Sequence, residues 1–394
     1  MDMDSTHIQD DQAASMRRPV PHLGPAFVTD HDAAHWAHQQ IGNRRETVFG
    51  GLVFKRDDGM YLPTVPVAGT ATAFDFQSDL LKVDANRNFL AYEGHSVHAL
   101  YSSRAGDGAR RSAQIQHWTD AQRRLDRSFF PINILRIIIQ VRRLCTRYYL
   151  SGFYGSLIQY ESSGSATEAS FLSKLMAAKP AADFDDYIAF INETARAGYL
   201  RVIVANAELG GKPGQLLTPW TLNQTLSQIG QEALAPLASP VSRRWQDAVR
   251  AVLPPLGFAR QESHFGYLYK SASNQFVAEF PSDELKAAFA LTSGKLSLPK
   301  VHKADSEFLT FGIYCSLSPQ AKPTVAKESW LAENFFPASA LAAVAMMAGT
   351  DDLGLHFYLR ANDGALLMYH CTGSQAQSRL FAHYGAEIDR RLKD

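Results

Sequence analysis

Two pairs of histidines are the first candidates for metal binding or acid–base chemistry. His95 and His98 lie in the segment EGHSVH, and His35 and His38 lie three residues apart in a predicted helix. On a strand, residues three apart face opposite sides of the sheet, so His95 and His98 cannot easily share a metal ion. Ordinary packing or surface roles are therefore the favoured interpretation of both pairs.

The common catalytic and nucleotide-binding motifs are absent from the chain. There is no Gly-x-Ser-x-Gly elbow, no Walker loop and no Gly-x-Gly-x-x-Gly segment. The three cysteines, Cys145, Cys315 and Cys371, are too few and too scattered for a disulfide framework or a cysteine zinc site, which suggests a reducing compartment. A Ser/His/Asp triad stays open as an alternative, because space and not chain order defines one.

Basic residues form three clusters, at 104–111, 123–127 and 142–147. A solvated protein face is the favoured interpretation of these clusters. The alternative is a groove that binds an anion or a partner, because the arginine fork suits carboxylate or phosphate.

The chain repeats itself with a period of about 210 residues, which indicates a duplicated domain and not a solenoid. Six short segments recur in the same order, with small changes in offset between them. The matched segments are 46–52 with 262–268, 61–66 with 276–281, 73–74 with 288–289, 101–104 with 314–317, 129–131 with 335–337, and 149–164 with 358–373.

Both copies show the same succession of predicted elements. Each begins with a helix (32–40 or 242–252) and a first strand (49–55 or 265–270) that turns into a second one. A further strand ends at Tyr101 or Tyr314, a helix follows Pro131 or Pro337, and a strand pair closes the copy. The pattern predicts an α/β protein of the layered α+β kind, with two similar domains. Each domain is expected to have a mixed, mostly antiparallel sheet flanked by helices.

The front end of the first copy carries a family resemblance. The segment Asp32-Ala-Ala-His-Trp-Ala, then Glu46 with Phe49-Gly50-Gly51, then the hairpin at 58–69 resemble JAB-like (JAMM/MPN-type) metallopeptidase domains. The likeness is to the bacterial branch found in polymorphic-toxin proteins. It covers residues 30–164 and reaches residues 242–373 only through the repeat. It implies a JAB/MPN fold in each copy, with the layering of the cytidine deaminases.

The resemblance also implies where a catalytic zinc would lie in an active member. Two histidines at a strand end and an aspartate at a helix start hold the metal in that family, and a glutamate takes a proton from its water. Here the strand end reads Ser102-Ser103-Arg104, the aspartate position holds Asn133, and only Glu46 remains. We therefore predict no metal and no other cofactor in copy one.

Copy two has lost the same ligands. The corresponding positions hold Glu262, Cys315, Leu317 and Ser339, and one thiol without partners makes no zinc site. Tyr267 is aligned with Gly51 and is expected to fill space that the glycine leaves open. We expect copy two to be filled and structural.

Copy one is expected to keep a polar cleft that carries any binding. Its candidate binding residues are Glu46, Ser102, Ser103, Arg104 and Asn133. An Arg104–Glu46 ion pair is predicted to close this cleft, since an opposite charge offsets the cost of a buried carboxylate.

Length, composition and charge set the frame for these expectations. The chain has 394 residues, and its 39 basic and 39 acidic residues cancel, which excludes a strong overall footprint for nucleic acid or an anionic membrane. No apolar run approaches the roughly 18 residues of a membrane span. We predict a disordered segment at 1–27, copy one at 28–164, a helical connector with one strand at 165–240, and copy two at 241–394. A cytoplasmic location is expected, with export by a specialised secretion system left open.

Two functions from different classes fit these observations. The first is a catalytically degenerate JAB-like protein that binds a protein partner or ligand as a scaffold, in a bacterial toxin or effector system. The second is a metal-free hydrolase or toxin effector, with Glu46 as base to Ser102 in a rebuilt site. The distance between the Glu46 carboxylate and the Ser102 hydroxyl discriminates between them.

Overall fold

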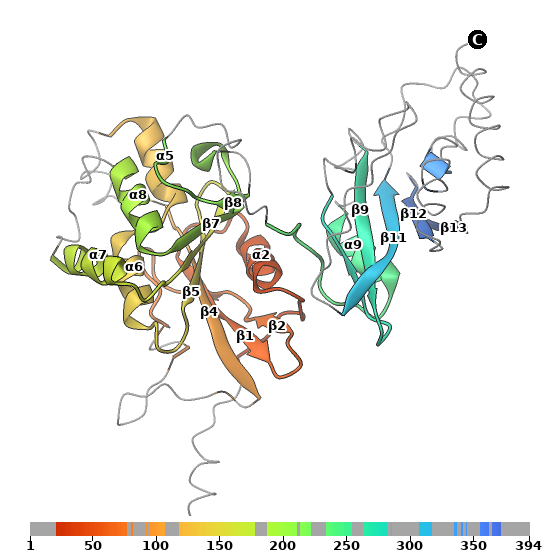
Figure 1. Cartoon of the computed structure of the whole chain (residues 1–394), viewed down its shortest axis with the longest axis horizontal. Helices are drawn as coiled ribbons and strands as arrows, with labels where there is room; N and C mark the ends of the chain where they lie inside the picture. The colour runs from red at the N-terminus through yellow and green to blue at the C-terminus, as the bar shows by residue number, and fades with distance from the viewer. Residues whose placement is uncertain are drawn as a thin grey trace, which may run out of the picture. The chain divides into compact units, whose positions relative to one another are not determined.

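The computed structural model divides the chain into unit 1, Met1–Leu234, and unit 2, Ala235–Asp394 (Figure 1). The structure describes residues 21–76, 80–81, 92, 94–106, 118–177, 187–210, 213–221, 234–253, 263–281, 285, 307–316, 335–336, 340–341, 344, 355–361 and 365–371. Both units are mixed α/β, each with a mixed sheet and flanking helices.

An eight-stranded sheet forms the centre of unit 1, with the order β2-β1-β4-β5-β6-β7-β8 and β3 paired to β1. Strands β4 and β5 run parallel, and the other neighbours are antiparallel. The strands are β1 (Phe49–Arg56), β2 (Tyr61–Pro63), β3 (Val67–Ala68), β4 (His95–Ser103), β5 (Arg147–Ser151), β6 (Leu157–Glu161), β7 (Tyr199–Val204) and β8 (Gly214–Gln215).

Helices cover both faces of this sheet. Figure 1 shows α5 to α8 grouped on one side and α2 on the other. The helices are α2 (Asp30–Ile41), α5 (Asp120–Ser128), α6 (Ile132–Gln140), α7 (Ala166–Ala177) and α8 (Tyr187–Ala197), with a short 3₁₀ helix at Ala207–Leu209.

Two neighbouring tyrosines of β5 mark the two faces, because successive strand residues point to opposite sides. Tyr148 packs edge-on against Phe130 in the apolar core under α5 to α8. Tyr149 packs edge-on against His31 of α2. The α2 face is therefore where polar groups meet, and the opposite face holds the main core.

Unit 2 repeats five of these strands in the same order and sense. Its order is β10-β9-β11-β12-β13, and β11 and β12 form the parallel pair. The elements are α9 (Trp245–Val252), β9 (His264–Ser271), β10 (Phe276–Ala278), β11 (Phe308–Ser316), β12 (Leu355–Arg360) and β13 (Leu366–Cys371). The repeat in the sequence thus corresponds to a repeated sheet.

The strand registers correct one position of the sequence alignment. Gly51 pairs with Tyr101 in unit 1, and Gly266 pairs with Tyr314 in unit 2. Gly51 therefore corresponds to Gly266, not to Tyr267, and the expectation that Tyr267 fills the place of Gly51 is wrong. In each unit the tyrosine ring occupies the space where a β-carbon on the glycine would lie.

Two predicted segment boundaries are also wrong. Residues 21–27 are ordered, since Leu23 and Phe27 form β-bridges to the β2 region and Phe27 is buried. Strand β7 hydrogen-bonds to β6, so the predicted connector contributes a strand to the sheet of unit 1. The apolar side chains of α7 and α8 join the same core. Residues 1–20 and the helix predicted after Thr218 lie almost wholly outside the described residues.

Within the described residues, no helix combines the length and the apolar character needed to cross a bilayer.

Gly51→Ala tests the close approach of glycine and tyrosine. The added methyl group would overlap the Tyr101 ring and the Thr64 hydroxyl, so we expect a loss of about 1–3 kcal/mol in the free energy of unfolding. Denaturant unfolding followed by circular dichroism measures it. Gly106→Ala is the matched control, because its nearest neighbours would lie 3.8 Å away. Equal midpoints for the two variants would contradict the close approach.

Candidate functional site

The predicted site residues of β4 are turned into the protein. Ser102 is fully buried, and its hydroxyl accepts a 2.8 Å hydrogen bond from Tyr148. Ser103 is also buried, and its hydroxyl accepts from the backbone N–H of Phe49 at 2.9 Å. Both hydroxyls therefore join β4 to neighbouring strands.

Arg104 forms an ion pair different from the predicted one. Its guanidinium donates to the Asp126 carboxylate at 2.7 Å, and both side chains are buried. Tyr187 donates to the other oxygen of that carboxylate. The predicted Arg104–Glu46 pair is wrong, because α5 places Asp126 at the end of β4 and Glu46 is exposed.

The remaining predicted positions do not converge on β4. Glu46 and Asn133 are exposed, and within the described residues neither makes a hydrogen bond or an ion pair with Ser102 or Arg104. In unit 2, Cys315 is buried and burial raises the pKa of its thiol. Glu262, Leu317 and Ser339 lie outside the described residues.

A polar cluster lies instead at the carboxyl ends of the parallel strands β4 and β5, centred on Ser151. The Ser151 hydroxyl lies 2.7 Å from Nδ1 of His38, on α2. Arg45 donates to the Ser151 hydroxyl at 3.0 Å and to its carbonyl oxygen at 3.1 Å. In open α/β sheets, the carboxyl ends of strands are where ligand sites form.

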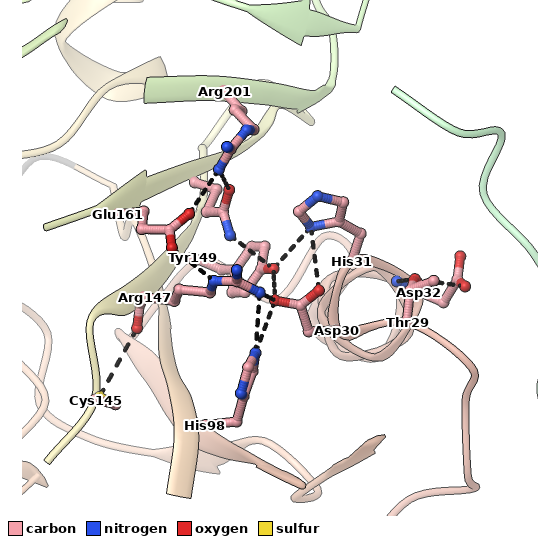
Figure 2. Close-up of polar contacts among 11 residues, drawn as sticks. Thr29, Asp30, His31, Asp32, His98, Cys145, Arg147, Tyr149, Glu161 and Arg201 are labelled. Carbon is pink, nitrogen blue, oxygen red and sulfur yellow. Dashed lines mark hydrogen bonds and ion pairs between the residues drawn. The ribbon is translucent and has the colours of Figure 1, made fainter. Parts of the chain in front are cut away.

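A second polar network surrounds Asp30, at the start of α2 (Figure 2). Its Oδ2 atom accepts hydrogen bonds from Arg147 at 2.8 Å, from Tyr149 at 2.8 Å and from His98 at 3.1 Å. These partners come from β5 and β4, so Asp30 joins the helix to two strands. Thr29 caps the helix by accepting from the Asp32 N–H, and the helix dipole adds to the stabilisation of a carboxylate there.

The charged groups of the Asp30 network are all paired with groups of opposite charge. Arg147 also contacts Glu161 at 3.2 Å, and Arg201 donates to Glu161 at 2.8 Å. Two carboxylates, Asp30 on α2 and Glu161 on the sheet, thus face two guanidinium groups of the sheet. Such a network can remain partly buried because every charge has an opposite neighbour.

The pKa values of this network follow from that arrangement. Burial by itself raises the pKa of Asp30, but the His98 hydrogen bond and the charges of His31 and Arg147 outweigh it, so the pKa lies well below its usual range. Burial lowers the pKa of His31, and the Asp30 carboxylate offsets only part of that effect.

The hydrogen-bond pattern fixes which His31 nitrogen carries the proton. Tyr149 uses its only hydrogen on Asp30, and it accepts from Gln159 at 3.1 Å. Nδ1 of His31, 2.8 Å from the same hydroxyl, must therefore donate. Nε2 is left as an acceptor, able to take a proton or a hydrogen bond from a ligand.

Unit 2 carries aromatic groups at the positions of the Asp30 network. By strand register, Phe311 takes the place of His98, His356 that of Arg147, and Tyr358 that of Tyr149. The Trp245 and Tyr358 rings lie 4.2 Å apart, and the Phe311 and His356 rings stack at 4.3 Å. The two units therefore use one strand arrangement for different side-chain chemistry.

The sequence does not single out Asp30 or Arg45 as site residues, and it marks Arg147 only as part of the basic cluster at 142–147. His98 and His38 are predicted as pairs with near neighbours, whereas their partners lie over 60 residues away. The placement of α2 against the sheet brings Asp30 and His38 to β4 and β5, and no signal in the sequence predicts that placement. Among the described residues, no three His, Cys, Asp or Glu side chains are grouped to hold a metal ion.

Searches with the sequence against protein-family models and curated proteins, and with the structure against solved structures, found no match.

Asp30→Asn tests the network through pH. The native pKa of Asp30 lies below the unfolded value of 3.8, so its contribution is present above about pH 4 and is lost as the pH falls further. We expect the free energy of unfolding of the variant to be about 3 kcal/mol lower at pH 7. We also expect that free energy to fall less steeply below pH 4 than in the wild-type chain, measured by denaturant unfolding at several pH values. Asp58→Asn is the control, because Asp58 pairs with Arg56 on the surface. An unchanged acid profile in Asp30→Asn would remove Asp30 from the centre of the network.

Proposed function

We propose that the chain is a duplicated, catalytically degenerate JAB-like protein that acts as a binding or scaffold module for a protein partner. The proposal rests on the residues at the carboxyl end of β4, where the resemblance places the zinc ligands of active members. Ser102, Ser103 and Arg104 are buried and bonded to other groups of the protein. Side chains that hold the fold in this way are poorly placed to do chemistry.

The residues present do not fit a zinc ion of the family's kind. Ser102 is a weak ligand whose hydroxyl already accepts from Tyr148, and Arg104 brings a positive charge that repels a dication. Asn133 is exposed on α6. We derive no step through a metal at this site.

The competing hypothesis is a metal-free hydrolase in which Glu46 activates Ser102. A base must lie within hydrogen-bond reach of the proton it takes. Glu46 is exposed, whereas the Ser102 side chain is fully buried against Tyr148. This geometry favours the binding proposal over the hydrolase.

The proposed partner is a protein in a bacterial toxin or effector system, in the cytoplasm or reached by specialised secretion. The balanced charge of the chain supports a protein over a nucleic acid.

Site-specific photo-crosslinking tests the binding module. A photo-reactive amino acid is placed at Glu46 or Asn133, the two exposed positions predicted for the site, and at Lys55 as an exposed control near the other end of β1. The proposal assigns partner binding to the predicted residues, so we expect Glu46 and Asn133 each to capture the same protein, identified by mass spectrometry, and Lys55 not to capture it. Capture from all three positions alike, or from none, would contradict the proposal.

Metal content and activity separate the two hypotheses. After zinc loading and dialysis we expect substoichiometric zinc and no peptidase or esterase activity above that of the Ser102→Ala variant. Hydrolysis that disappears in both Ser102→Ala and Glu46→Ala would replace the binding module with the hydrolase.

A further inference from the structure

Arg45 is a buried cation whose hydrogen bonds within the described part of the chain go to neutral groups. The residue is 9% exposed, and its two terminal nitrogens donate to the carbonyl and the hydroxyl of Ser151. Its Nε atom is buried and has no hydrogen-bond acceptor within the described part of the chain. A guanidinium group has five N–H donors, and the two hydrogen bonds to Ser151 use two of them.

Arg104, which is also buried and follows the carboxyl end of β4, differs from Arg45 in having a carboxylate partner. Arg104 has the Asp126 carboxylate at 2.7 Å, whereas no carboxylate of the described residues pairs with Arg45. Burial lowers the pKa of Arg45 to about 10, so the side chain still carries its charge at neutral pH. A buried charge without an opposite charge is unfavourable, and an anionic ligand would relieve it.

The titratable neighbours of Arg45 do not supply that negative charge. His38 bonds to Ser151, and its ring stacks on that of His35. Burial lowers the pKa of His38 to about 3 and that of His35 to about 4, so both rings are neutral at pH 7. The cluster therefore has a net positive charge within the described residues.

His38 lies beside Arg45 through the Ser151 hydroxyl, which both side chains contact. The neutral His38 ring carries one N–H, and in the tautomer in which Ser151 donates to Nδ1 this proton is on Nε2, a second N–H donor. A guanidinium and an imidazole N–H together suit a group with two or more oxygen acceptors.

We propose that Arg45, with His38 beside it, binds an oxyanion group, a carboxylate or a phosphate, at the carboxyl ends of β4 and β5. The inference rests on the proposed binding function and names the chemistry of the ligand that unit 1 would bind. Arginine binds such groups through two parallel hydrogen bonds, which a single ammonium cannot reproduce. At the equivalent strand end of unit 2, opposite Ser316, the residue is itself an arginine, Arg360.

Thermal unfolding of the full chain in inorganic phosphate, acetate or chloride, at equal ionic strength, tests this site. A ligand that binds only the folded state raises the melting temperature with its concentration. We expect phosphate, acetate or both to raise it more than chloride. A rise with acetate alone identifies a carboxylate ligand, and a rise with phosphate alone identifies a phosphate group.

Arg45→Gln should abolish the anion-specific rise, and Arg45→Lys should weaken anion binding about tenfold, measured by calorimetry. Arg44→Gln is the matched control, because Arg44 is an exposed neighbour that lies over the Phe49 ring. If Arg45→Gln does not fold, the comparison of Arg45→Lys with the wild-type chain decides. Equal melting temperatures in all three salts, or a rise that persists without Arg45, would overturn the site.

The outcomes also separate this inference from the proposed function. An oxyanion effect that depends on Arg45, without capture of any protein at Glu46 or Asn133, would keep the site and remove the protein scaffold. Capture of one protein that is unchanged in Arg45→Gln, with no anion effect, would keep the scaffold and remove the site.

Discussion

In both units, a tyrosine ring packs across a glycine of the neighbouring strand, and this contact holds the central strands together. Tyr101 lies across Gly51, and its hydroxyl donates to the carbonyl of Thr64 at 2.7 Å. Tyr314 lies across Gly266 and donates to the carbonyl of Glu279. One side chain of the strand β4 or β11 thereby fixes the position of two neighbouring segments, and only glycine leaves room for it. The parallel neighbour, β5 or β12, takes its register from the same strand, so the strand-end groups depend on this crossing.

The two units carry different side-chain chemistry at the same strand positions: charged groups in unit 1 and aromatic groups in unit 2. In unit 1, Asp30 is bonded to His98, Arg147 and Tyr149. Among the described residues of unit 2, the strand positions of His98, Arg147 and Tyr149 hold Phe311, His356 and Tyr358, whose rings pack together. Removing one member of a buried ionic network leaves its partner uncompensated, at a cost of about 3–5 kcal/mol. An ionic set in unit 1 and an aromatic set in unit 2 each leave no lone charge at these strand positions, although the strand arrangement is the same.

The sequence predicted the layered α/β class, the repeat and most strands, because hydrophobic patterns report on backbone elements. It aligned the first strands of the two copies one residue out of step, because the Phe-Gly pair at 49–50 resembles that at 265–266, whereas the strand registers make Gly51 equivalent to Gly266. It also separated β7 from the sheet, because an apolar strand fits a central or an added edge position equally well. Side-chain partners such as Asp126 for Arg104 could not be predicted, because nothing local distinguishes one acidic residue from another 22 positions away.

Arg45 both connects structural elements of unit 1 and supplies the charge of the proposed anion site. Its carbonyl accepts from Gly106 after β4, and its guanidinium holds Ser151 at the end of β5, which in turn holds His38 of α2. One residue thus joins three elements at the edge where a parallel pair ends. An anion bound to Arg45, as we propose, would stabilise this junction, because binding to the folded state alone adds directly to the free energy of unfolding. The contacts that would bind the ligand are the same ones that hold the carboxyl ends of β4 and β5 to α2, so binding and local stability in unit 1 would change together.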